Sequence, residues 1–159
     1  MQSAALEVSV ERPTVVIAQL TEGAKLFVWS LRRWVISVNQ DRCAGCDLSG
    51  PYAELHCTDA IEAMHRLMSQ VSRHAARPIS IHALHTAAVS QDELALLRVV
   101  ALAGERVCTR HAQRILNSLV NARIPFICAY AADYYQKVTA AGHEFSGWGE
   151  LRLVRGITK

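Results

Sequence analysis

Apolar residues recur along most of this chain at alternating steps of three and four, which is the spacing of one face of an α-helix. Between Pro13 and Val38 this pattern predicts one long helix, with Lys25 and Arg32 on its polar side. Gly23 is a point at which this helix could kink or divide, because glycine destabilises a helix interior. The predicted inward positions are Leu20, Ala24, Phe27, Leu31, Trp34, Val35 and Val38.

A second helix is predicted from Pro51 to the residues before Pro78, because proline suits the first helical position and disfavours helix in the residue before it. Its apolar positions form a narrow seam made of Cys57, Ile61, Met64, Met68, Val71 and Ala75. Beyond Pro78, Ile79 and Ile81 alternate with polar residues. That alternation predicts a short extended segment near residues 79–83.

Start and stop signals predict three further helices. Ser90 and Glu93 have the spacing of a capping box, which begins a helix over residues 91–103 that Gly104 would end. This helix is apolar on nearly all sides, so we expect it at the centre of the fold. Thr109 is placed to cap the next helix, which ends before Pro125.

The last helix is predicted from near Phe126 to the residues before Gly142. Together the elements predict an all-α fold, a single-domain bundle of about five helices over residues 1–159. Residues 1–12 and 143–159 are expected to be peripheral, and the C-terminal tail is expected to be irregular.

The composition fits one domain. Of the 159 residues, 51% are hydrophobic and 19% are charged, which is enough apolar surface to bury one core. No apolar stretch reaches the roughly 18 residues of a membrane span, and no secretory signal follows Met1. We therefore expect a soluble, cytoplasmic protein with no membrane partner. Five cysteines, an odd number, fit a reducing compartment.

Nucleic acid is not the expected partner. The formal charge of +3 is spread along the chain, so it permits nucleic-acid binding without indicating it. The predicted helix after Thr109 carries Arg110, His111, Arg114 and Arg123, which could contact DNA as part of a helix-turn-helix. The helix before it, however, is too uniformly apolar to lie on a DNA surface.

The stretch from Asp41 to Cys57 holds three of the five cysteines. Cys43 and Cys46 have the C-x-x-C spacing with which two thiolates can bind one zinc, and His56 is the third candidate ligand. Zinc is the one cofactor that this set could hold, and no other cofactor is expected. Cys57 falls on the inward seam of its predicted helix, so we expect it to be a buried structural thiol.

The same pair could instead be redox-active. That chemistry requires a lowered thiol pKa, which Arg42 would favour and Asp41 and Asp47 would oppose. The predicted context is also helical, rather than the strand-to-helix junction of thioredoxin-like motifs. Two ordinary loop thiols are the third interpretation, and all three stay open at this point.

The first helix carries more apolar surface than one neighbouring helix would cover. Aromatic residues concentrate in interface cores, so the face from Leu26 to Val38 predicts a homodimer. The predicted interface residues are Phe27, Trp29, Trp34 and Ile36. The alternative is that the same residues belong to the core of a single chain.

The last predicted helix contains tyrosines that could line a small-ligand pocket. Tyr130 and Tyr134 share one helical face, and Arg98 could supply a polar contact. Aromatic residues at four-residue spacing are equally the pattern of an ordinary core.

The stretch "RPISIHALHTAAVSQDELALLRVVALAG", residues 77–104, resembles a pattern in a family of small bacterial all-helical proteins. In that pattern an Arg-Pro and an extended His-containing segment lead into a Ser-x-Asp-Glu helix start and a Leu/Ala-rich helix. In the family cysteines follow the histidine, whereas this chain has "TAAV", so the resemblance implies no metal site here. It implies a helix start at Ser90 and lends no activity.

The leading functional expectation is a non-enzymatic helical protein that acts through protein–protein contacts as a homodimer. The alternatives are a metal- or redox-responsive regulator using Cys43 and Cys46, and a small-ligand-binding domain with a Tyr-lined pocket. Nucleophile-elbow, P-loop, dinucleotide-binding and H-E-x-x-H motifs are missing from the sequence, so no catalytic residue is assigned.

Overall fold

The computed structural model describes residues 14–105, 109–121 and 125–145. Within these ranges the chain forms six α-helices, one short 3₁₀ helix and no strand. The α-helices are α1 (Glu22–Asn39), α2 (Ala44–Glu54), α3 (Ala60–Arg73), α4 (Gln91–Glu105), α5 (Thr109–Asn117) and α6 (Pro125–Ala140), and the 3₁₀ helix η1 spans Ile17–Gln19. The predicted all-α fold is confirmed. None of the described helices combines the length and apolar character needed to cross a membrane.

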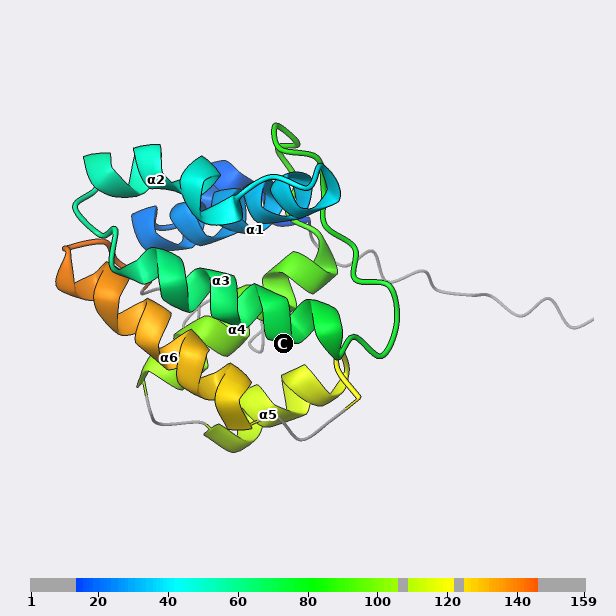
Figure 1. The fold of residues 1–159 in the computed structure, drawn as a ribbon. Helices are drawn as coiled ribbons and strands as arrows, with labels where there is room; N and C mark the ends of the chain where they lie inside the picture. The colour runs from blue at the N-terminus through cyan, green and yellow to red at the C-terminus, as the bar shows by residue number, and fades with distance from the viewer. Residues whose placement is uncertain (1–13, 106–108, 122–124, 146–159) are drawn as a thin grey trace, which may run out of the picture.

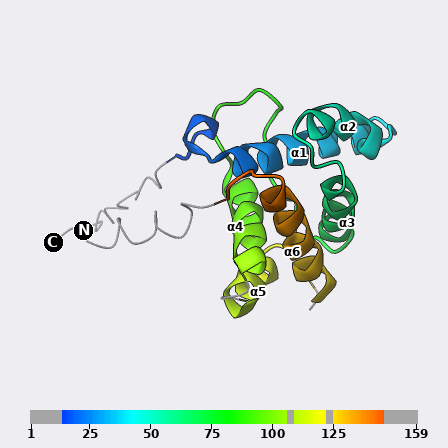
Figure 2. The same cartoon turned by 90° about the vertical axis from the view of Figure 1, so that its left-hand side faces the viewer.

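Three of the helices form a layer, and the other three lie at its two ends (Figure 2). Helix α6 lies between α4 and α3, and the three stand side by side in Figure 2, whereas α4 crosses behind α3 in Figure 1. Helices α1 and α2 lie across one end of this layer, and α5 lies at the opposite end (Figure 2). Helix α4 is buried on most sides, as its sequence predicts, through Leu94, Leu96, Leu97, Val99 and Val100.

The predicted capping box is present at the start of α4. The Ser90 N–H donates to Glu93 Oε2 at 2.8 Å, and the Glu93 N–H donates to Ser90 Oγ at 3.0 Å. Helix α4 continues past its predicted end, because Gly104 lies inside it. A Cβ at Gly104 would fall 2.0 Å from the ring of Tyr135, so this glycine lets Tyr135 of α6 pack directly against α4 and is not a stop signal.

The predicted helix over residues 51–77 is wrong, because the chain forms two helices with a turn between them. Pro51 lies inside α2 instead of starting it, and α2 begins at Ala44. The turn is a Schellman motif centred on His56, whose φ is 57°. There the His56 N–H donates to Ala53 O at 3.2 Å and the Cys57 N–H donates to Tyr52 O at 3.0 Å. Cys57 is buried as expected, but in this turn and not on a helix.

Other predicted boundaries shift at the ends. The first helix begins at Glu22, so Gly23 lies in its first turn and does not divide it. Residues 79–83 form no strand. Helix α5 starts at Thr109 itself and ends at Asn117, well before Pro125. Helix α6 ends at Ala140, as predicted from Gly142, whereas residues 1–13 and 146–159 of the predicted periphery lie outside the described residues.

Arg32 contradicts its predicted place on a polar, solvent-facing side. Its side chain is completely buried, and its Nε and Nη2 donate to the two carboxylate oxygens of Glu93 at 2.8 and 3.0 Å. The same guanidinium donates to Thr86 O at 2.6 Å and to Ala88 O at 2.8 Å. Glu93 also accepts the His82 N–H at 3.0 Å. This network ties α1, α4 and the irregular segment 82–90 into one unit.

We predict that Glu93→Gln lowers the free energy of unfolding by about 3–5 kcal/mol, because it leaves the Arg32 charge buried without its partner. The His82 and Ser90 N–H groups donate to different oxygens of Glu93, so the single oxygen of glutamine keeps one of these two hydrogen bonds and loses the other together with the charge. Urea unfolding monitored by circular dichroism measures the effect. A loss below about 1 kcal/mol, the value of a surface pair, would contradict the assignment.

The same pair predicts a pH dependence. Burial alone would raise the pKa of Glu93, but the hydrogen bonds from Arg32 and from the backbone prevail and hold this pKa below its usual 4.5. The stabilisation is therefore present above pH 4.5 and is lost as pH falls below it. Between pH 7 and pH 3 the stability difference between the native protein and Glu93→Gln should shrink. A constant difference over that range would count against the pair.

The Schellman turn at His56 yields another prediction. A non-glycine residue at positive φ costs about 1 kcal/mol, and the His56 side chain is exposed. His56→Gly should therefore raise the free energy of unfolding by about 0.5–1 kcal/mol. Gly142→Ala is the matched control, since φ at Gly142 is 95° and nothing lies within 4 Å of an added Cβ. It should lower stability by a similar amount, and thermal unfolding compares the two.

Candidate dithiol site

Cys43 and Cys46 lie at the beginning of α2, where the sequence predicted an irregular loop. Cys43 is the N-cap residue of the helix, with an extended backbone, and Cys46 lies in the first turn. The Cys46 N–H donates to Cys43 Sγ at 3.3 Å, so a sulfur occupies the place that a serine or aspartate oxygen usually takes. The Cys46 thiol also donates to Cys43 Sγ, at 2.7 Å. Both hydrogen bonds favour the thiolate form of Cys43 over its thiol.

The two sulfurs are therefore electrostatically different. The pKa of Cys43 is lowered, first by the hydrogen bond from the Cys46 thiol and then by the backbone N–H of Cys46. The pKa of Cys46 is raised, because its proton is held in the hydrogen bond to Cys43. A low-pKa thiolate beside a thiol that keeps its proton is the arrangement of a nucleophilic cysteine and its resolving partner.

Exposure separates this pair from the other cysteines of the described chain. Cys43 and Cys46 are exposed, whereas Cys57 is buried and Cys128 is half-buried. Burial raises the pKa of both Cys57 and Cys128, which makes these thiols unreactive. The fifth cysteine, Cys108, lies outside the described residues.

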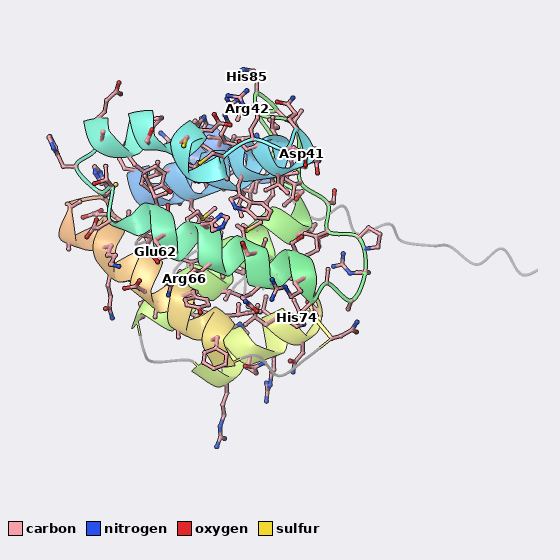
Figure 3. The ribbon with its side chains drawn as sticks, in the orientation of Figure 1. Asp41, Arg42, Glu62, Arg66, His74 and His85 are labelled. Atoms are coloured by element: carbon pink, nitrogen blue, oxygen red, sulfur yellow. The ribbon has the colours of Figure 1, made fainter. Side chains whose placement is uncertain are left out.

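The start of α2 is held against the end of α1 by Asp47. Its carboxylate accepts a 2.6 Å hydrogen bond from Ser37 Oγ and another of 2.6 Å from Arg42. The Ser37 hydrogen bond is the first cause that lowers the pKa of Asp47, and Arg42 adds to it. Asp41, in a left-handed conformation with φ 52°, and Arg42 form the turn between the two helices (Figure 3). The dithiol therefore sits on a turn with defined hydrogen bonds.

The three predicted zinc ligands are not brought together, which corrects that prediction. His56 follows the C-terminus of α2, while Cys43 and Cys46 lie at its N-terminus. Ten residues separate Cys46 from His56, or about 15 Å along a helix. Among the described residues no group of three or more His, Cys, Asp or Glu side chains is placed to hold a metal ion. The predicted helix start at Pro51 left Cys43 and Cys46 on a loop before the helix, whereas α2 begins at Ala44 and ends before His56.

Two of the four predicted interface residues belong to the core of the chain itself. Phe27 is fully buried, and its ring packs edge-on against Tyr134 of α6 with centroids 5.4 Å apart. Trp34 is 5% exposed, and its Nε1–H donates to His65 Nδ1 at 3.1 Å. The assignment of Phe27 and Trp34 to a subunit interface is therefore wrong. Trp29 and Ile36 are half-buried, and their role in an interface stays a prediction.

The tyrosines of the predicted pocket pack against other side chains and do not line a common pocket. Tyr134 is fully buried, and its hydroxyl is 2.8 Å from the hydroxyl of Tyr52, which in turn is 2.7 Å from Ser30 Oγ. Tyr130 is half-buried and faces the guanidinium of Arg66 on α3, 5.8 Å from its ring centroid. Arg98 is half-buried on α4. Tyr134 thus joins a hydroxyl chain inside the core, and Tyr130 faces a different neighbour.

The sequence predicted Asp47 only as a charge that opposes the Cys43 thiolate, and the hydrogen bond that Ser37 donates to this carboxylate was not predicted. A signal for Asp47 existed, because acidic residues are enriched in the first turn of helices and Asp47 follows Cys43 by four positions. Ser37 gave no comparable signal, since its contact depends on how α1 and α2 cross.

Comparison of this chain with protein-family models, with curated proteins and with solved structures finds no match. The resemblance of residues 77–104 to a bacterial helical family stays a prediction.

The charge of Asp47 opposes the Cys43 thiolate, since it raises the pKa of Cys43. We predict that Asp47→Asn increases the rate at which iodoacetamide alkylates Cys43 at pH 7 by about twofold, the effect of one exposed charge. Asparagine keeps an oxygen for the Ser37 hydroxyl. Mass spectrometry of the Cys43 peptide follows the reaction, with the buried Cys57 as an internal reference.

Asp41→Asn is the matched control. It removes the same charge from the neighbouring turn, and asparagine tolerates the left-handed backbone of that position. Asp41 is not among the causes that shift the pKa of Cys43. Equal acceleration by both substitutions would show a general charge effect, and slower alkylation in Asp47→Asn would contradict the assigned role of Asp47.

Proposed function

We propose that this protein is a redox-responsive regulator in which Cys43 and Cys46 form a thiol–disulfide switch. The observation that carries the proposal is the double hydrogen bond from Cys46 to Cys43 Sγ at the start of α2, with sulfurs 2.7 Å apart. A disulfide has an S–S bond of about 2.05 Å, so its closure needs only a small movement of two exposed side chains.

The chemistry is thiol–disulfide exchange. The Cys43 thiolate attacks one sulfur of a disulfide RSSR, forming a mixed disulfide and releasing RS⁻. The Cys46 thiol then gives its proton to a released thiolate and attacks Cys43 Sγ, which expels the second RS⁻. In sum, the protein dithiol is oxidised to a disulfide by two electrons, and RSSR is reduced to two RSH.

Oxidation would act on the junction of α1 and α2. The disulfide removes the negative charge of the Cys43 thiolate, which the N-terminus of a helix stabilises. The same negative charge lies near Asp47, whose carboxylate links Ser37 and Arg42. The turn at Asp41 and Arg42 is thus the surface that a protein partner would distinguish in the two redox states.

The geometry favours this function over the homodimer expected from the first helix. Phe27 and Trp34 of the predicted interface are buried in the core, whereas hydrogen bonds from Cys46 lower the pKa of Cys43 in the dithiol. Binding of a protein partner is compatible with a switch and forms part of the proposal.

The test is a redox titration with glutathione buffers, in which free thiols are tagged and located by peptide mass spectrometry. We expect a two-electron transition of Cys43 and Cys46 together, with a midpoint between about −320 and −120 mV. Cys57 should stay reduced throughout. A pair that remains a dithiol across this whole range would refute the proposal.

Single-cysteine variants test the order of the steps. Cys46→Ser should accumulate a mixed disulfide between Cys43 and glutathione, because the resolving thiol is missing. Cys43→Ser should accumulate less, because burial and the charge of Asp47 still raise the pKa of Cys46 when the contributions of Cys43 are gone. The opposite order of reactivity would overturn the assignment of Cys43 as the nucleophile.

A further inference from the structure

A cavity of about 290 Å³ lies between the C-terminal parts of α1 and α3 and the irregular chain that follows α3, and neither cysteine of the dithiol lines it. In Figure 1 this is the side on which that chain rises past the ends of both helices. Its lining consists of Trp34, Val35, Val38 and Asn39 from α1, Met68, Val71 and Ser72 from α3, and Ala75, Arg77, Pro78, Ile79 and Ile81 from the segment beyond α3.

The inner surface of the cavity is apolar. Trp34, Met68 and Val71 are buried at 5% exposure or less. Ile79 and Ile81 are partly buried and pack against the same core. Val38 is 41% exposed, although large apolar side chains are mostly covered elsewhere in the described chain. Water against this apolar part of the lining finds few hydrogen-bond partners, so an apolar body would displace it favourably.

The irregular wall of the cavity is fixed in place before any ligand arrives. Arg77 donates to both carboxylate oxygens of Asp92 at 2.8 and 2.9 Å, and the Ser80 N–H donates to Asp92 at 2.8 Å. Ser90 Oγ donates to Ser80 O at 2.6 Å. The pKa of Asp92 is lowered, first by the Arg77 hydrogen bonds. A preorganised wall reduces the ordering that a ligand would have to induce.

The polar groups of the lining indicate the kind of ligand. Among the residues that line the cavity Arg77 alone is charged, and Asp92 already neutralises it. Asn39 and Ser72 are exposed, come from opposite helices and carry uncharged hydrogen-bonding groups. An ionised ligand would therefore find no unmatched opposite charge.

The volume limits the size of the ligand. A cavity of about 150 Å³ binds benzene, so 290 Å³ accommodates on the order of ten non-hydrogen atoms. This volume is at the lower end of small-molecule sites and too small for a peptide helix to enter.

We propose that this cavity binds a small, uncharged molecule that has an aromatic or branched apolar body and one hydrogen-bonding group. The apolar body lies against Trp34, Met68 and Val71, and the polar group faces Asn39 or Ser72 at the mouth. This site is separate from the dithiol and does not depend on the proposed redox function.

Indole is a suitable probe, since it has nine non-hydrogen atoms, no charge and one N–H. Titration of the full chain, labelled at its methyl groups and followed by NMR, should give saturable shifts with a dissociation constant at or below about 1 mM. Intermolecular NOEs should connect indole to the methyl groups of Met68, Val71, Ile79 and Ile81. NOEs to a different set of methyls, or shifts that do not saturate, would overturn the proposal.

Ser72→Trp should weaken indole binding by about tenfold or more, because a bulky side chain at the mouth competes for the cavity. Arg73→Trp is the control, since Arg73 is exposed, adjacent on α3 and not part of the lining, and it should change binding by less than about twofold. Equal effects of the two substitutions would refute the site. Cys43→Ser should bind indole normally, which separates this test from that of the switch.

Discussion

The fold depends on one buried ion pair, between Arg32 of α1 and Glu93 of α4. Two charges taken out of water are tolerated only when their remaining hydrogen-bonding groups are satisfied, and here they are. Arg32 donates to three backbone carbonyls of the segment before α4, and Glu93 accepts two backbone N–H groups of the same segment. The pair therefore orients two helices and fixes a connection of seventeen residues that has no regular structure of its own, residues 74–90.

That fixed connection explains how a small helical protein can contain a preformed cavity. Two ion pairs hold the segment after α3 in place: Arg32 with Glu93, and Arg77 with Asp92. The two carboxylates, Asp92 and Glu93, are neighbours in the first turn of α4. Carboxylates at the start of a helix are also stabilised by its dipole. Ile79 and Ile81 can then form a wall opposite α1 and α3. The start of α4 is thus the common support of the ion pairs, the connection and the cavity.

The position of the dithiol depends instead on the end of α1 and on the two ends of α2. Helix α1 ends in a left-handed residue at Asp41, and α2 ends in another at His56, so a helix of eleven residues lies between two tight turns. The first turn presents Cys43 as the cap of α2, where the unpaired N–H groups of a helix favour a negatively charged sulfur. The same turn leaves Asp47 beside Ser37, which holds α2 against α1. Two cysteines spaced by two residues acquire unequal proton affinities because the Cys46 thiol donates to Cys43 Sγ and because Cys43 also accepts a backbone N–H as the cap.

The sequence by itself determined the helical class, the buried character of α4, its capping box at Ser90 and the end of α6 before Gly142. These features follow from local spacing and backbone preferences, which act within a few residues. The tertiary structure decided the rest. It buried Arg32 by giving it Glu93 sixty-one residues away, placed Trp34 against His65, and divided the second helix at a histidine that takes a conformation glycine usually supplies. It also placed the C-x-x-C pair at the start of α2, with Cys43 as the N-cap residue, and separated the pair from His56 by the length of α2. Such contacts depend on which helices cross and at what distance, and that information is not contained in the periodicity of any one segment.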